Sequence, residues 1–139
     1  VGALSDLADV DLGGHHRLRL RARMDREAYT RLLDSAYAGL SLMYAPHPSL
    51  VPFELAQSGA LVVTNLYSNR GTAYFDDISP NIVPAELSLE SVTEQVAAVL
   101  ERADRLTAKP CPRFNNRWSR SWDEACRSIT SRLAEEDLV

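Results

Sequence analysis

The stretch LSLMYAPHPSLVPFELAQSGALVVTN, residues 40 to 65, decides the fold that this sequence predicts. It runs from a mostly apolar segment through a proline-rich turn into a short helical pattern, and then into a second apolar segment. The apolar segments are predicted to be strands buried on both faces, as is typical of parallel sheets covered by helices. The residues between them, PHPSL at 46 to 50, then follow the carboxyl end of a strand and precede a helix over 51 to 58, which Gly59 ends.

Strands and helices alternate on either side of this stretch. HRLRLRA, residues 16 to 22, alternates in polarity as a strand with one wet face does. Asp25 stands where the N-cap of a helix over 26 to 37 belongs. The remaining expected segments are a loop over 67–81, a short strand within NIVPAE at 81–86, a helix capped by Ser88, a linker with two prolines, and a last helix opened by the capping pair Ser121 and Glu124. This order predicts an α/β fold of three layers with a parallel sheet flanked by helices.

Composition restricts the class of protein. The 139 residues carry a net charge of -4, which argues against a nucleic-acid binder. No apolar run approaches the roughly 18 residues that cross a bilayer, and no secretory signal is visible. The two cysteines, Cys111 and Cys126, and the three histidines fit no metal-ligand spacing, so no metal is expected. No cofactor is expected either. The chain starts at Val1 in what looks like the middle of a fold, so we expect part of a longer polypeptide.

The polar residues of the turn and the helix after it are candidate ligand contacts. The first turn of a helix has unpaired N–H groups and about +0.5 charge, which favours an anion such as phosphate. Ser49 can donate its hydroxyl and His47 its imidazole N–H to such an anion. Glu54, one turn further on, can accept two hydrogen bonds from a ribose diol. The same residues also fit an N-capping serine, a loop histidine and an exposed acid favoured by the helix dipole, and spacing alone leaves both interpretations open.

The residues GLSLMYAPHPSLVPFELAQSGALVVTN, 39 to 65, resemble the C-terminal domain of GT-B glycosyltransferases. Within that group they look most like the bacterial rhamnosyltransferase-like enzymes of surface polysaccharide assembly. The upstream YTRLLDSAYAGLSLM and the downstream WSRSWDEACRSI are similar to the same group. The resemblance implies a Rossmann-like parallel sheet flanked by helices, which is most of the C-terminal half of a GT-B fold. Residues 1–110 would be an N-terminally incomplete donor-binding domain, and residues 111–139 a linker and a closing helix.

The resemblance also implies roles for single residues. In the wider retaining group, two glutamates eight positions apart flank this turn, and the second binds the ribose of the donor nucleotide. Glu54 in ELAQSG matches the second glutamate, whereas Pro46 stands where the first would be. His47 and Ser49 are then implied as contacts to the diphosphate or the sugar. The donor sugar and the stereochemical outcome therefore stay open.

Two further residues follow the second apolar strand. Arg70 is expected to bring positive charge to the departing diphosphate, and Asn65 to line the pocket. Each also fits an ordinary surface loop or turn. No residue is assigned a catalytic role, because the resemblance implies that the acceptor site and any base lie on a missing N-terminal domain. The fragment alone is therefore expected to be inactive.

The function expected from the sequence is donor binding in a glycosyltransferase. The donor is a nucleotide-diphospho-sugar, with dTDP-rhamnose as one candidate, and the acceptor is a glycan. The expected location is the cytoplasm, with membrane association of the full-length protein left open. The alternative is a non-catalytic Rossmann-like nucleotide-binding or interaction module. An epimerase-like enzyme of the same fold would need further catalytic acids, and the motif offers only Glu54.

Overall fold

The computed structural model describes residues 8–44, 49–108 and 121–135 of the chain. The chain divides into two compact units, Val1–Ala36 and Tyr37–Val139. The larger unit contains the parallel sheet. The expected boundary near residue 110, between a donor-binding domain and a closing helix, stays a prediction.

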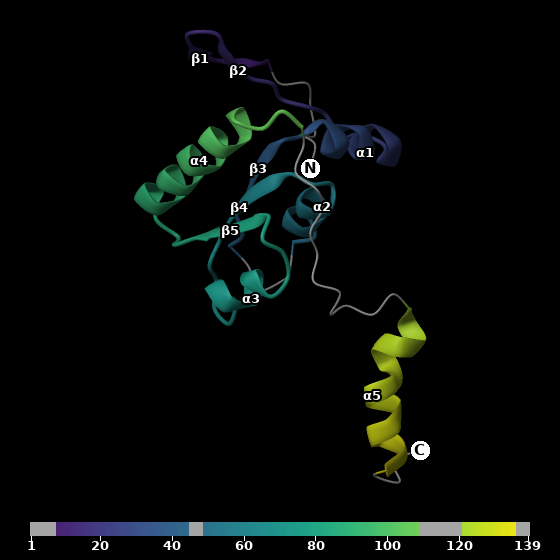
Figure 1. Cartoon of the computed structure of the whole chain (residues 1–139). Coiled ribbons are helices and arrows are strands. Elements are labelled where there is room, and N and C mark those ends of the chain that lie inside the picture. Colours follow the sequence, from purple (N-terminus) through teal and green to yellow (C-terminus); the bar gives the residue numbers. More distant parts are fainter. Residues whose placement is uncertain (1–7, 45–48, 109–120, 136–139) are drawn as a thin grey trace. The chain divides into compact units, whose positions relative to one another are not determined.

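Three parallel strands form the sheet of the larger unit (Figure 1). In their order across the sheet these strands are β3 (Ala38–Ser41), β4 (Leu61–Asn65) and β5 (Ile82–Ala85). Val63, at the centre of β4, pairs with Leu40 of β3 and with Val83 of β5. All five residues of β4 are buried, because strands flank it and helices cover the sheet. The predicted α/β, Rossmann-like architecture is confirmed.

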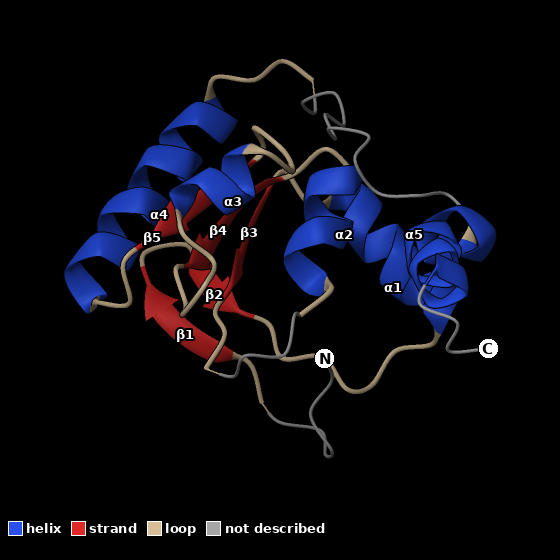
Figure 2. Ribbon diagram, turned by 90° about the horizontal axis from the view of Figure 1, so that it is seen from below, coloured by secondary structure: helices blue, strands red, loops and turns tan. Residues whose placement is uncertain are grey.

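Three helices connect and cover these strands. They are α2 (Val51–Gln57) between β3 and β4, α3 (Thr72–Asp76) between β4 and β5, and α4 (Leu89–Asp104) after β5. Helices α2 and α4 lie on opposite faces of the sheet (Figure 2). Gly39 of β3 faces α2, and a Cβ atom there would lie only 2.7 Å from Cδ1 of Leu55. Glycine at this position therefore lets α2 approach the sheet closely.

The helix over α4 forms as the sequence predicts. The Ser88 hydroxyl accepts a hydrogen bond from the Ser91 backbone N–H at 3.1 Å, which confirms Ser88 as the N-cap. The apolar stripe of α4 packs on the sheet around a buried cluster made of Leu61, Val63, Ala85 and Val99. Burial of a side chain such as Val99 contributes about 1.5–3 kcal/mol, so this face is a main source of stability.

The loop predicted over 67–81 is wrong in one part, because it contains α3. This helix has five residues, too few to show a helical period in the sequence. Phe75 within it is fully buried. Packing of this aromatic ring, rather than helix propensity, therefore accounts for the helix.

The described part of the smaller unit contains a hairpin that the sequence did not predict. Strand β1 (Val10–Gly13) pairs antiparallel with β2 (His16–Leu18), and both are exposed along their whole length. The prediction of a strand over 16–22 is therefore too long, and this strand pairs with β1 rather than with the parallel sheet. Gly13 and Gly14 have φ angles of 86° and 65°, a left-handed conformation that glycine adopts without strain and that allows the chain to reverse.

Helix α1 (Arg26–Ser35) follows the hairpin, two residues shorter than predicted. The Asp25 carboxylate accepts a hydrogen bond from the Ala28 N–H at 2.7 Å, which confirms the predicted N-cap.

The last helix described is α5 (Trp122–Glu135). The Ser121 hydroxyl accepts from the Glu124 N–H at 3.2 Å, so the predicted cap forms. Cys126 is an exposed free thiol, whereas Cys111 lies outside the described residues. Within the described ranges, no helix has both the length and the apolar character needed to cross a membrane.

Candidate functional site

The predicted site residues come from four segments of the larger unit. Ser49 lies between β3 and α2, Glu54 in the first turn of α2, Asn65 at the end of β4, and Arg70 between β4 and α3. His47 lies outside the described residues, so its predicted role stays a prediction. The carboxyl ends of β3 and β4 meet at one edge of the sheet because the strands are parallel. Ligands of open α/β sheets bind at this kind of edge.

Met43, just beyond the end of β3, brings two of these residues together. Its thioether sulfur accepts the backbone N–H of Ser49 at 3.0 Å and faces Nη1 of Arg70 at 3.9 Å. Met43 itself is buried, with 7% of its surface exposed. Ser49 and Arg70, far apart in sequence, therefore share one neighbour at the sheet edge.

Asn65 fixes the backbone of Met43. Its Oδ1 accepts the Met43 N–H at 2.6 Å, and its Nδ2 donates to the Met43 carbonyl at 2.9 Å and to the Leu66 carbonyl at 3.0 Å. The opposite orientation of the amide would set donor against donor, so the pattern defines which atom is which. Asn65 is fully buried, and both of its amide hydrogens are donated within the protein. It supports the chain that leaves β3, and a direct contact to a ligand stays a prediction.

Arg70 belongs to a tight turn. Its backbone N–H donates to the Tyr67 carbonyl at 2.9 Å, and the Tyr67 N–H donates back at 3.4 Å. Inside the turn, Ser68 has a φ of 50°, the left-handed conformation that a turn of this kind requires. The half-buried Arg70 side chain lies over the ring of Tyr74 on α3, with 5.7 Å between the guanidinium carbon and the ring centroid. The guanidinium of Arg70 therefore lies between Tyr74 of α3 and the sulfur of Met43.

Sequence reasoning missed Met43 and Tyr74 as members of this site. Met43 lies in an apolar run, which predicts a core residue. Tyr74 lies in the segment that is predicted to be a loop. No helical spacing links Tyr74 to Arg70, because Arg70 lies in the turn before α3.

Ser49 and Glu54 lie at the start of α2. The Ser49 hydroxyl accepts the Val51 N–H at a long 3.4 Å, and a hydroxyl that accepts one bond can also donate one. Glu54 is half-buried, and its backbone N–H donates to the Leu50 carbonyl at 2.9 Å. The helix is held on the sheet by the buried side chains Pro52, Phe53, Leu55 and Ala56. The predicted contact between the Glu54 carboxylate and a ribose stays a prediction.

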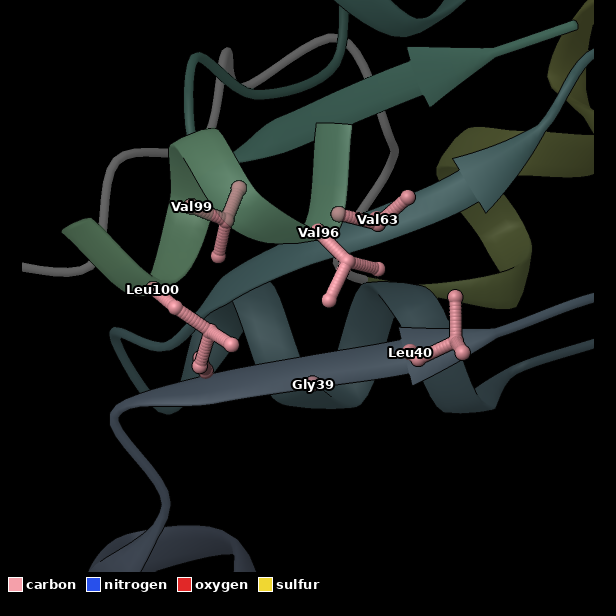
Figure 3. Close-up of a pocket in the computed structure, with 7 residues that line it drawn as sticks. Gly39, Leu40, Val63, Val96, Val99 and Leu100 are labelled. Carbon is pink, nitrogen blue, oxygen red and sulfur yellow. The ribbon is translucent and has the colours of Figure 1, made fainter. Parts of the chain in front are cut away.

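Two of the apolar cavities lined by described residues lie on the α4 side of the sheet. One, of about 170 Å³, lies between β3 and α4 and is lined by Leu40, Val63, Val96, Val99 and Leu100 among others (Figure 3). The other, of about 280 Å³, is lined by Leu42, Leu87, Ser88, Leu89 and Val92. Neither is lined by Ser49, Glu54, Asn65 or Arg70. Over the described residues, no three His, Cys, Asp or Glu side chains gather as a metal site would need.

The comparison with protein families finds one that spans this whole site. The family model described as WsaF, C-terminal domain, matches residues 1–97, which is more than half of the 139 residues. The matched part includes the sheet, α2, α3 and all the candidate site residues. No curated protein matches the chain. The chain belongs to the family of the WsaF C-terminal domain, a domain of glycosyltransferase-like proteins.

Proposed function

We propose that this domain binds the nucleotide-diphosphate part of a nucleotide-sugar in a glycosyltransferase that passes the sugar to a glycan acceptor. Membership of the WsaF C-terminal domain family supports glycosyl transfer as the chemistry. The observation that carries the proposal is the convergence of Arg70 and Ser49 on Met43, at the carboxyl edge of β3 and β4.

The chemistry of donor binding assigns a role to each of these groups. When the bond between the sugar and the diphosphate breaks, negative charge grows on the leaving phosphate oxygen. A guanidinium beside that oxygen stabilises the charge, and Arg70 is the cation in question. Ser49 donates its hydroxyl to a phosphate oxygen, and the Glu54 carboxylate accepts from the ribose hydroxyls. His47 adds an N–H donor to the diphosphate or the sugar.

The remaining parts of the proposal concern the whole enzyme. This domain is the donor half of a GT-B architecture, and a further domain contributes the glycan acceptor site and any catalytic base. dTDP-rhamnose is one candidate donor, and the cytoplasm is the proposed location. Asn65 acts in this scheme through Met43, by holding the backbone that carries the site.

Calorimetric titration of the protein with dTDP, UDP and GDP tests the proposal. We expect saturable binding of at least one of them. Arg70→Ala and Glu54→Ala should each weaken that binding by about tenfold to a hundredfold, since hydrogen bonds to charged groups contribute roughly 1.5–3 kcal/mol. Arg102→Ala and Glu94→Ala, at exposed positions of α4, are the matched controls and should bind as the unaltered protein does. Absence of binding to all three nucleotides would instead favour a non-catalytic interaction module.

A further inference from the structure

Side chains from two different elements lie against the guanidinium of Arg70. Nη1 lies 3.9 Å from the sulfur of Met43, which follows β3, and the guanidinium carbon lies 5.7 Å from the ring centroid of Tyr74 on α3. We propose that Met43 and Tyr74 are positioning residues that set the Arg70 guanidinium in advance for a bound diphosphate. The choice of ligand rests on the proposed function, whereas the positioning is a property of the protein without ligand.

The chemistry of these two contacts suits a cation that must still bind an anion. A thioether is a weak acceptor, and an aromatic face attracts a cation without neutralising it. Both contacts therefore restrict the side chain without cancelling the charge that attracts a phosphate. A carboxylate in either place would compete directly with the phosphate.

Both positioning residues are themselves fixed. The Met43 backbone is clamped through its N–H and its carbonyl by the buried Asn65 amide, at 2.6 and 2.9 Å. The Tyr74 ring meets the ring of Phe75 edge-on, with centroids 5.1 Å apart and planes at 83°. Phe75 is fully buried and so anchors α3. The restraint on Arg70 therefore reaches back to the core from two directions.

An advantage in affinity follows from this restraint. A long side chain that is already ordered loses less conformational freedom when the ligand binds, and for one side chain this corresponds to about two- to tenfold in Kd. The same sulfur accepts the Ser49 N–H at 3.0 Å, so Met43 also fixes where Ser49 lies relative to Arg70.

Substitutions that keep volume but remove the holding group test the proposal. Met43→Leu removes the sulfur, and Tyr74→Leu removes the aromatic face. Each should raise the Kd for the nucleotide diphosphate that binds best by about two- to tenfold. Tyr74→Phe keeps the face and should bind as the unaltered protein does. Met24→Leu, in the segment before α1, is the matched control for the loss of a thioether.

A thermodynamic cycle separates positioning from general damage to the fold. In an Arg70→Ala background, Tyr74→Leu should have no further effect on Kd, because the group that it positions is gone, and Met43→Leu should keep only the smaller effect that comes through Ser49. A loss of affinity on Tyr74→Leu that persists in this background would overturn the proposal.

A second measurement needs no ligand. The {¹H}–¹⁵N NOE of the Arg70 Nε–Hε group should be high in the unaltered protein and should fall in Met43→Leu and in Tyr74→Leu, while Tyr74→Phe retains it. A low NOE in the unaltered protein, or a high one in both leucine variants, would overturn the positioning. If Tyr74→Leu fails to fold, the NOE of Arg70 in Met43→Leu decides the matter.

The two proposals fail in different ways. If no nucleotide diphosphate binds, the proposed function is wrong, and the NOE alone decides whether Arg70 is held. If nucleotide binds and Arg70→Ala weakens it but the leucine variants do not, the function stands and the positioning is wrong.

Discussion

At the scale of a single residue, the side chain of Asn65 links the end of β4 to the segment that follows β3. It lies at the end of β4, and the backbone that it clamps belongs to Met43, 22 residues earlier. The sequence made the end of a strand at Asn65 predictable, because a buried apolar run stops there. It did not reveal the partner, since a contact over 22 residues leaves no periodic signal. Polar residues at strand ends are therefore easy to find in a sequence, but their hydrogen-bond partners are hard to predict.

Replacement of Asn65 by alanine should destabilise the protein strongly. The change leaves the N–H and the carbonyl of Met43 without partners in a buried place, and each such group costs about 1–3 kcal/mol. We expect a total loss of roughly 2–4 kcal/mol in the free energy of unfolding, measured by urea denaturation. Asn69→Ala, at an exposed position of the nearby turn, is the control and should change stability by less than about 0.5 kcal/mol. Equal effects at the two positions would contradict the clamp.

Helices and strands of this protein differ in how well the local sequence predicts them. The N-caps at Asp25 and Ser88 were correct because a cap depends on residues within one turn. Strand β4 was correct because a short apolar run between turn residues favours a strand buried on both faces. The β1–β2 hairpin was missed because its strands are short and exposed, and α3 because it depends on burial of Phe75 rather than on its own period.

Phe75 should therefore be essential to α3. Its side chain is fully buried, and Phe75→Ala should reduce the free energy of unfolding by about 3–5 kcal/mol. Tyr74→Ala, one residue earlier and only partly buried, serves as the comparison and should cost clearly less. Thermal or urea unfolding followed by circular dichroism measures both. Similar losses would mean that α3 is not anchored through Phe75.

The contact of α2 with β3 gives a second prediction at this scale. An added Cβ at Gly39 would lie 2.7 Å from Leu55, whose side chain is buried and has little room to move. Gly39→Ala should destabilise the protein by about 1–3 kcal/mol, the usual effect of overpacking. Gly71→Ala is the matched control, since a Cβ there meets nothing within 4 Å and its backbone is extended. If both variants are equally stable, α2 can move away without loss.

The candidate site depends on the whole topology of the larger unit. Ser49, Asn65 and Arg70 lie in three segments, and the parallel order β3–β4–β5 is what places these segments at one edge. The sequence predicted that edge correctly because it predicted the parallel strands. It did not predict the holding contacts of Arg70, since these depend on where Met43 and Tyr74 point after folding.

Burial also predicts how the rate of backbone amide hydrogen exchange varies along the chain. Backbone amides of β4 lie in a fully buried central strand, whereas those of β1 and β2 lie in a hairpin with exposed side chains. Hydrogen exchange followed by mass spectrometry should therefore find the slowest exchange in peptides covering 61–65 and much faster exchange over 10–18. Uniform exchange over both regions would argue against a stable core centred on β4.

The position of β3 at the end of the sheet has a practical consequence. Among the described strands only β4 pairs with it, and Leu40 and Leu42 beside its outer side are about half exposed. Its four residues include no lysine or proline that would discourage pairing with another chain. Concentrated solutions of this chain should therefore tend to aggregate through β3. Leu40→Lys is the first substitution to try when a soluble sample is wanted.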